Sequence, residues 1–163
     1  MPSELAGGSL KLDFRRASAL VLDRDLLCIQ ILVAMLNGFG LRSIARYQEV
    51  AQAIDGLNSR TIDIVIMDPT GYGDKGYGLV SWLRSSSAHP NHGATVVLAT
   101  GYPTVKAISH MKTCTADFLI SKPFSTATLF DRLVWVAQQE GKRGQMLAPG
   151  NVVSTTGSGV DLW

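Results

Sequence analysis

Short apolar runs rich in β-branched residues alternate along this chain with segments whose apolar residues recur at helical spacing. The runs span residues 17–22, 41–45, 61–68, 94–99 and 116–120, and the amphipathic segments span residues 26–37, 49–57, 79–85, 103–111 and 125–139. A short apolar run predicts a buried strand, whereas a period of 3.6 residues predicts a helix. Because strands and helices alternate throughout, the pattern predicts an α/β fold in which a five-stranded parallel sheet carries helices on both faces.

The two ends of the chain lack this pattern. Residues 1–16 show no long periodicity, so they are expected to form an N-terminal arm. Residues 141–163 are rich in glycine, serine and threonine, which is typical of a flexible C-terminal tail. One domain over residues 17–140 is the expected organisation, since a chain of 163 residues can bury one core of ordinary size.

The third apolar run ends abruptly in Asp68, and a glycine-rich segment follows it. Residues 69–78 contain four glycines, which predicts a loop and delays the next helix until Leu79. Loops at strand ends often carry function. Taken alone, Asp68 could merely open a turn, because Asp before Pro is common in loops.

Composition and charge indicate a globular protein but do not indicate which partner it binds. A hydrophobic fraction of 46%, a charged fraction of 17% and a formal charge of +2 fit a globular protein with no bias toward a charged polymer. The chain shows no run of membrane-spanning length and no secretory signal, so a cytoplasmic location is expected. Cys28 and Cys114 lack CxxC spacing and a nearby histidine pair, which predicts buried reduced thiols rather than a zinc site.

Polar residues follow several of the predicted strands. In an open parallel sheet the carboxyl ends of the strands share one edge, and ligands bind outside that edge. The residues expected there are Asp23, Arg24 and Asp25 after the first strand, Asp68 after the third, Thr100 after the fourth and Lys122 after the fifth.

This set resembles the receiver domain of bacterial two-component response regulators, the chemotaxis-regulator fold. The resemblance rests on Asp68 at a strand end, Gly76 beyond it, Thr100-Gly101 and Lys122-Pro123-Phe124, and it covers residues 17–139. It implies a flavodoxin-like sheet with strand order 2-1-3-4-5. The stretch Ala99-Thr100-Gly101-Tyr102 further resembles a variant in a branch of alphaproteobacterial single-domain receivers.

The resemblance implies a role for each residue. Asp68 would accept phosphate from a histidine kinase or a histidine phosphotransfer protein. Asp23, Asp68 and the backbone carbonyl of Thr70 would hold Mg²⁺, which prefers oxygen ligands. Lys122 would pair with the phosphoryl group, and the Thr100 hydroxyl would donate to it and report the modification to the surface of helix four, strand five and helix five.

Three departures from the family pattern affect these roles. Arg24 stands where a second acid is usual. Its guanidinium could supply positive charge in place of the metal, or a shift of the turn could let Asp25 reach the metal while Arg24 points to solvent. Leu119 replaces the usual aromatic switch residue. Gly71-Tyr72 replaces the usual Met-Pro, which is expected to make the loop more mobile.

The leading hypothesis is a single-domain response regulator that is not an enzyme and that signals through contacts with an unknown protein target. No DNA-binding domain is expected, because the segment after residue 139 is too short for a helix-turn-helix unit, and no membrane contact is expected. The alternative is a pseudo-receiver, a binding adaptor that works without phosphorylation, as Arg24 and Leu119 indicate.

A remote third hypothesis is a haloacid-dehalogenase-type phosphatase. Leu22-Asp23-Arg24-Asp25 resembles the DxD motif of that family, and Thr100 and Lys122 follow in the same order. The usual Gly-Thr after the motif is absent, however, and this reading leaves Asp68 without a role.

Overall fold

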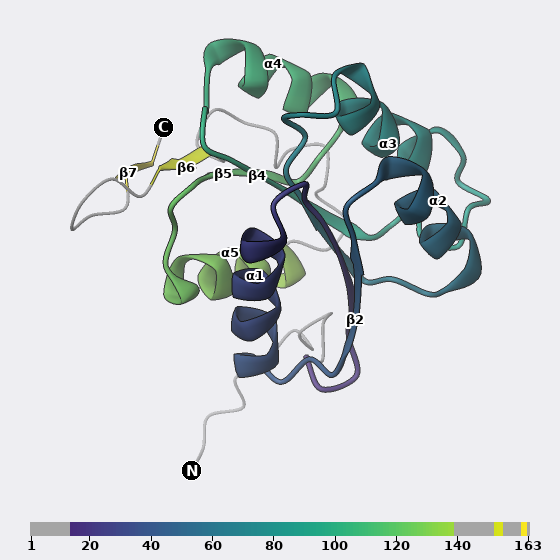
Figure 1. Cartoon of the computed structure of the whole chain (residues 1–163), viewed down its shortest axis with the longest axis horizontal. Coiled ribbons are helices and arrows are strands. Elements are labelled where there is room, and N and C mark those ends of the chain that lie inside the picture. The colour runs from purple at the N-terminus through teal and green to yellow at the C-terminus, as the bar shows by residue number, and fades with distance from the viewer. Residues whose placement is uncertain (1–13, 139–151, 155–160, 163) are drawn as a thin grey trace.

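A single sheet runs through the middle of the molecule and carries helices on both faces (Figure 1). The computed structural model describes residues 14–138, 152–154 and 161–162. The elements are β1 (Ser18–Leu22), α1 (Leu26–Gly38), β2 (Ser43–Tyr47), α2 (Val50–Ser59), β3 (Ile64–Met67), α3 (Asp74–Ser85), β4 (Thr95–Thr100), α4 (Val105–Cys114), β5 (Phe118–Ser121), α5 (Thr126–Gln138), β6 (Val152–Ser154) and β7 (Asp161–Leu162). No helix in the described part of the chain is long and apolar enough to cross a membrane.

The first five strands are parallel and lie in the order β2-β1-β3-β4-β5, which confirms the predicted doubly wound arrangement. β1 lies between β2 and β3, so that Leu20 has Ala45 on one side and Val65 on the other. Every residue of β3 and β4 is buried, as expected for strands that are covered on both faces. The carboxyl ends of β1 and β3 therefore lie side by side.

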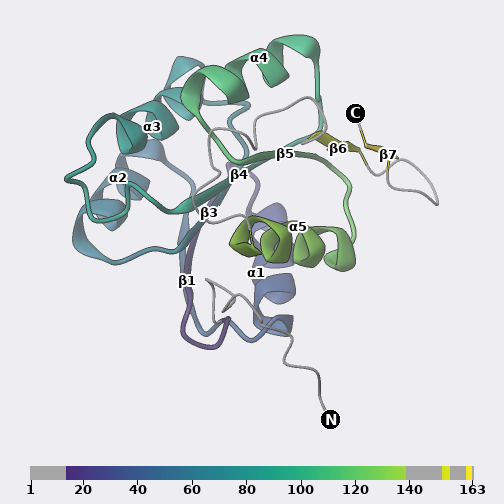
Figure 2. The ribbon, with the colours of Figure 1, turned by 180° about the vertical axis from the view of Figure 1, so that it is seen from behind.

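The helices divide the core in two. α1 and α5 cover one face of the sheet, and α2, α3 and α4 cover the other (Figures 1 and 2). Ile64 and Ile66 belong to the core under α1 and α5, whereas Val65 and Met67 belong to the core under the other three helices. Because successive residues of a strand point to opposite faces, the unbroken apolar run of β3 contributes to both cores. Each such side chain contributes about 1.5–3 kcal/mol when it is fully buried.

Two short strands extend the sheet beyond β5. β6 pairs in parallel with β5, where Leu119 lies opposite Val152, and β7 pairs antiparallel with β6. Both strands fall in the segment for which the sequence predicts a flexible tail, so that prediction missed the pairing. The apolar pair Val152-Val153 was the signal for a strand. The rest of residues 141–163, like residues 1–13, lies outside the described residues.

Helix α3 begins at Asp74, so the prediction that residues 69–78 form a loop is wrong for its second half. Gly73 has a φ of 59° and ends the loop just before the helix. Gly76 is buried, and a Cβ at this position would lie 2.5 Å from the carbonyl oxygen of Pro69. The glycine therefore allows the helix to approach the loop closely rather than breaking the helix.

The two helical glycines are expected to respond to alanine in opposite ways. Gly76→Ala should lower the free energy of unfolding by about 1–3 kcal/mol, because the new methyl group would overlap the Pro69 backbone. Gly78→Ala should raise it by about 0.5–1 kcal/mol, because a Cβ there meets no atom within 4 Å and alanine favours the helix. Denaturant unfolding measures both changes, and a stabilising Gly76→Ala would contradict the described packing.

Candidate functional site

Four polar residues meet where the parallel strands end. Asp23 follows β1, Asp68 follows β3, Thr100 ends β4 and Lys122 follows β5. Backbone hydrogen bonds continue the sheet to these positions: the amide of Asp68 donates to the carbonyl of Leu22 at 3.1 Å, and the amide of Lys122 donates to the carbonyl of Thr100 at 2.7 Å. The register of the strands therefore sets the relative positions of these residues, at the edge of the sheet that the sequence indicates.

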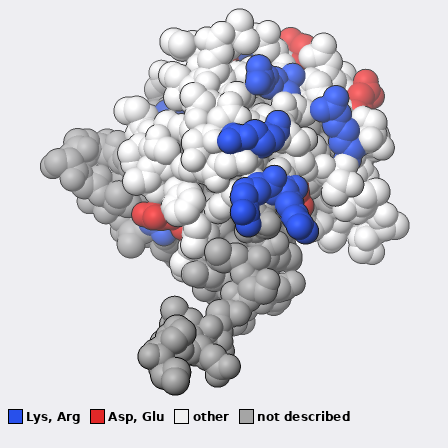
Figure 3. Space-filling view, turned by 90° about the horizontal axis from the view of Figure 1, so that it is seen from below, with Lys and Arg blue, Asp and Glu red and all other residues white. Residues whose placement is uncertain are grey.

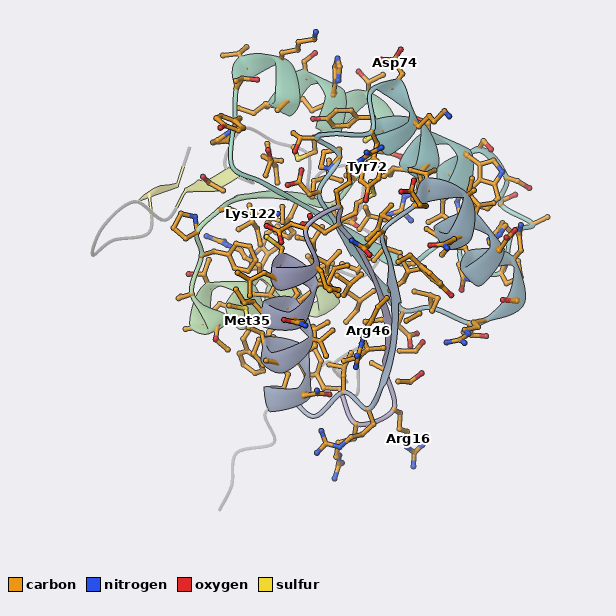
Figure 4. All side chains as sticks on the ribbon, in the orientation of Figure 1. Arg16, Met35, Arg46, Tyr72, Asp74 and Lys122 are labelled. Atoms are coloured by element: carbon orange, nitrogen blue, oxygen red, sulfur yellow. The ribbon has the colours of Figure 1, made fainter. Side chains whose placement is uncertain are left out.

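Lys122 joins the two carboxylates. Its Nζ lies 2.6 Å from Oδ2 of Asp23 and 2.9 Å from Oδ2 of Asp68. The two Asp side chains are only 5% and 12% exposed, so water screens these charges weakly. Burial by itself would lower the pKa of Lys122, but hydrogen bonds to both carboxylates raise that pKa well above its ordinary value. Figure 4 shows Lys122 beside the first turn of α1, at the same end of the sheet as Tyr72.

The other carboxylate oxygen of Asp68 is held by Thr70. The amide of Thr70 donates to Oδ1 of Asp68 at 2.9 Å, and the Thr70 hydroxyl donates to the same oxygen. An Asp that opens an ordinary turn makes similar local bonds. The contact with Lys122, 54 residues away, is what an ordinary turn does not explain. Both oxygens of Asp68 are thus engaged, and the orientation of the carboxylate is fixed.

Asp25 is engaged at the start of α1. Its carboxylate accepts a hydrogen bond from the amide of Leu27 at 2.9 Å, and its own amide donates to Oδ1 of Asp23 at 2.9 Å. Among the described residues, no three His, Cys, Asp or Glu side chains are grouped so that they could hold a metal ion. The oxygen donors that the family resemblance implies are Asp23, Asp68 and the carbonyl of Thr70. This hard donor set fits Mg²⁺, which usually keeps several waters and needs few protein ligands.

Arg24 does not lie between the carboxylates. Its guanidinium carbon lies 4.7 Å from the centroid of the Tyr72 ring, as in a cation–π contact. Lys122, rather than Arg24, bridges Asp23 and Asp68. The expectation that Arg24 takes the place of the metal is therefore not met by its position in this structure.

Thr100 is fully buried, and its hydroxyl accepts a hydrogen bond from the amide of Tyr102 at 3.1 Å. On the neighbouring strand, Leu119 and Phe118 belong to opposite cores, as the alternation of side chains along a strand predicts. The aliphatic Leu119 is completely buried. Because its side chain is aliphatic, Leu119 cannot act as an aromatic switch residue that moves between a buried and an exposed position.

An apolar pocket that sequence reasoning missed lies beside Lys122. It has a volume of about 290 Å³ and is lined by Cys28, Ile31, Leu32, Met35, Pro123 and Phe124 together with Lys122. Cys114 is buried as predicted, but Cys28 is only half-buried because it lines this pocket. Helix α1 contains more apolar residues than one buried face of a helix needs, and this excess was the signal for the pocket in the sequence.

The model of the response regulator receiver domain matches residues 19–134. Chemotaxis response regulator CheY4 of Vibrio cholerae superposes with a TM-score of 0.65 at 19% identity, covering 74% of this chain and 98% of that chain. The signal receiver domain of a DNA-binding response regulator (merR) from Colwellia psychrerythraea 34H superposes with a TM-score of 0.67 at 22% identity. This match covers 76% of this chain and 99% of that chain.

A third solved structure, the CheX-CheY-BeF3-Mg²⁺ complex from Borrelia burgdorferi, gives a TM-score of 0.65 at 19% identity and covers 74% of this chain and 88% of that chain. At these identities the solved structures show a shared fold. No curated protein matches the sequence.

Proposed function

The chain belongs to the response regulator receiver domain family, and we propose that it accepts a phosphoryl group on Asp68 from a histidine kinase or a histidine phosphotransfer protein. The observation that carries this proposal is the position of Lys122, whose Nζ contacts both Asp68 and Asp23 at the carboxyl ends of the strands. These contacts support the proposal, because the proposed nucleophile, a second carboxylate and a lysine cation belong to one contact network. Phosphoryl transfer depends mainly on such positioning and charge neutralisation.

Each residue of the site has a role in this reaction. An oxygen of Asp68 attacks the phosphorus of phosphohistidine, so that an O–P bond forms while the P–N bond breaks and the imidazole leaves with the electron pair. Lys122 pairs with the transferred group while it keeps its contact with Asp23. The Thr100 hydroxyl accepts from the Tyr102 amide, which leaves its hydrogen for a phosphoryl oxygen. Mg²⁺ held by Asp23, Asp68 and the Thr70 carbonyl would neutralise phosphoryl charge when bound.

The surface next to the site supports a protein as the phosphate donor. Leu26, Leu27 and Ile31 of α1 are 54%, 61% and 48% exposed. Ile31 also lines the apolar pocket that reaches Lys122. Exposed apolar side chains grouped at a site are typical of a protein interface. The chain would then act through protein contacts and not as an enzyme that turns over a substrate.

A second candidate function is that of a binding adaptor that works without phosphorylation. The buried Leu119 favours it, since an aliphatic side chain replaces the aromatic residue that the family uses for its output. The two candidates differ in whether Asp68 becomes phosphorylated.

Intact-mass measurement with a small phosphodonor separates the two candidates. Incubation with phosphoramidate, which carries a P–N bond, is expected to add the mass of one phosphoryl group when Mg²⁺ is present. Removal of Mg²⁺ with a chelator is expected to suppress the adduct, because the charge on the phosphoryl group is then less neutralised. A chain that stays unmodified with and without Mg²⁺ would favour the adaptor.

A further inference from the structure

Three loops at the edge of the site are joined by a closed ring of contacts. The Arg24 guanidinium, in the β1–α1 turn, lies 4.7 Å from the ring centroid of Tyr72, in the β3–α3 loop. The hydroxyl of Tyr72 donates to the carbonyl of Gln48, in the β2–α2 loop, at 2.7 Å. The side-chain amide of Gln48 donates back to the carbonyl of Arg24 at 2.9 Å. We call this ring of Arg24, Tyr72 and Gln48 the loop latch.

The latch is built into its surroundings. Tyr72 is only 7% exposed and packs in the core under α2, α3 and α4. Gly71 has a φ of 84°, and a Cβ on it would lie 3.1 Å from Cδ of Arg24. The glycine thus permits both the loop conformation and the passage of the Arg24 side chain.

The latch joins two departures from the family pattern that are far apart in the sequence. Arg24 stands where the family usually has an acid, and Gly71-Tyr72 stand where it usually has Met-Pro. In the structure the side chain of Arg24 runs past Gly71 and ends on Tyr72. The two changes therefore form one structural unit.

We propose that Arg24 is a positioning residue, which acts through Tyr72 to hold the β3–α3 loop and with it Thr70 against Asp68. Thr70 lies two residues before Tyr72 and donates both its amide and its hydroxyl to Oδ1 of Asp68. Holding Tyr72 in place limits the movement of Thr70, and so the carboxylate of Asp68 keeps one orientation. This inference rests on the proposed phosphoacceptor role of Asp68.

A fixed orientation matters because the attacking oxygen has to be in line with the bond that breaks. Misplacement of a reacting group by a fraction of an ångström slows a reaction that depends on alignment. A cation–π contact at an exposed position is weak. Its loss is therefore expected to slow the reaction by about two- to fivefold and not to abolish it.

The test compares Arg24→Ala, Tyr72→Leu and the double variant with the unaltered chain. Arg24→Ala removes the charge and the contact, whereas Tyr72→Leu keeps the charge and removes the contact. The rate of phosphoryl uptake is measured at saturating phosphoramidate and Mg²⁺, and hydrogen exchange is measured at the Thr70 amide. Both single variants are expected to slow uptake by about two- to fivefold and to speed exchange, and the double variant should be no slower than either.

Other results would overturn the proposal. A slower Arg24→Ala together with an unchanged Tyr72→Leu would mean that the charge of Arg24 acts directly, and multiplied effects in the double variant would mean that the two residues act independently. If the unaltered chain takes up no phosphoryl group, the phosphoacceptor role fails. The Thr70 exchange rates still test whether the latch holds the loop, because they do not depend on phosphorylation.

Gln48 is exposed, so a substitution there tests the latch without changing a buried side chain. Gln48→Ala removes the hydrogen bond to the carbonyl of Arg24 but leaves both stacking partners in place. It is expected to speed Thr70 exchange as the other variants do, though by a smaller factor. Gln52→Ala, an exposed glutamine on α2 outside the latch, is the matched control and should leave exchange unchanged. Equal exchange in these two variants and the unaltered chain would contradict the closed ring of contacts.

Discussion

Asp68→Asn is expected to leave the chain unable to take up a phosphoryl group from phosphoramidate. The amide is a poor nucleophile, and it carries no negative charge to pair with Lys122 or with a metal. Its size and shape match those of the carboxylate, so its oxygen can still accept the hydrogen bonds that Thr70 donates to Oδ1. The fold is therefore expected to survive while the chemistry is lost, and intact mass measures the uptake.

Asp74→Asn is the matched control for this experiment. Asp74 is an exposed acid in the first turn of α3, six residues beyond Asp68. Asp74→Asn removes one negative charge from the same region but leaves the contacts of Lys122 in place, so phosphoryl uptake should be unchanged. Undiminished uptake by Asp68→Asn would show that another residue is the acceptor.

Lys122→Met is expected to lower the rate of phosphoryl uptake by about 10²–10³-fold. Methionine fills a similar volume but supplies no charge, so the transferred group would lose the positive charge that Lys122 supplies to stabilise it. Lys106→Met is the control, because Lys106 is an exposed lysine at the start of α4. A rate close to that of the unaltered chain would mean that Lys122 serves only the fold.

The same variant tests the electrostatics of the site through the pH dependence of stability. The pKa of Lys122 in the folded chain lies above its ordinary value of 10.5, so the folded state holds this proton more tightly than the unfolded state does. The stabilisation from this lysine is therefore fully present below pH 10.5 and is lost as the pH rises above that value. The difference in unfolding free energy between the unaltered chain and Lys122→Met should be constant near neutral pH and shrink in alkali.

The sequence alone was enough to place the main residues of the site. Asp68 and Lys122 each follow an apolar run, and a parallel sheet brings the ends of such runs to one edge whatever their separation in the chain. This inference needs only the type and order of the elements. It does not need the conformation of any side chain.

The features that the sequence did not predict depend on contacts between distant residues. Helix α3 begins earlier than predicted, where Gly76 approaches the backbone of Pro69 closely. The glycine content of residues 69–78 alone indicates a loop there. The position of Arg24 depends on Tyr72, and Tyr72 is anchored in turn by Gln48. Local patterns carry no signal for such contacts, so tertiary packing decided these features.

The pairing of β6 with β5 has a consequence for the behaviour of the protein at high concentration. A strand with unpaired amides at the rim of a sheet is a template for aggregation. Among the described residues, the rim beyond β5 is β7, which spans Asp161–Leu162 and offers little length for pairing. The opposite rim is β2, where Arg46 is exposed and Arg42, just before the strand, is exposed too, and Figure 3 shows basic side chains gathered on the face seen from below. Two β2 rims would bring like charges together, so the protein is expected to resist aggregation through its sheet edges.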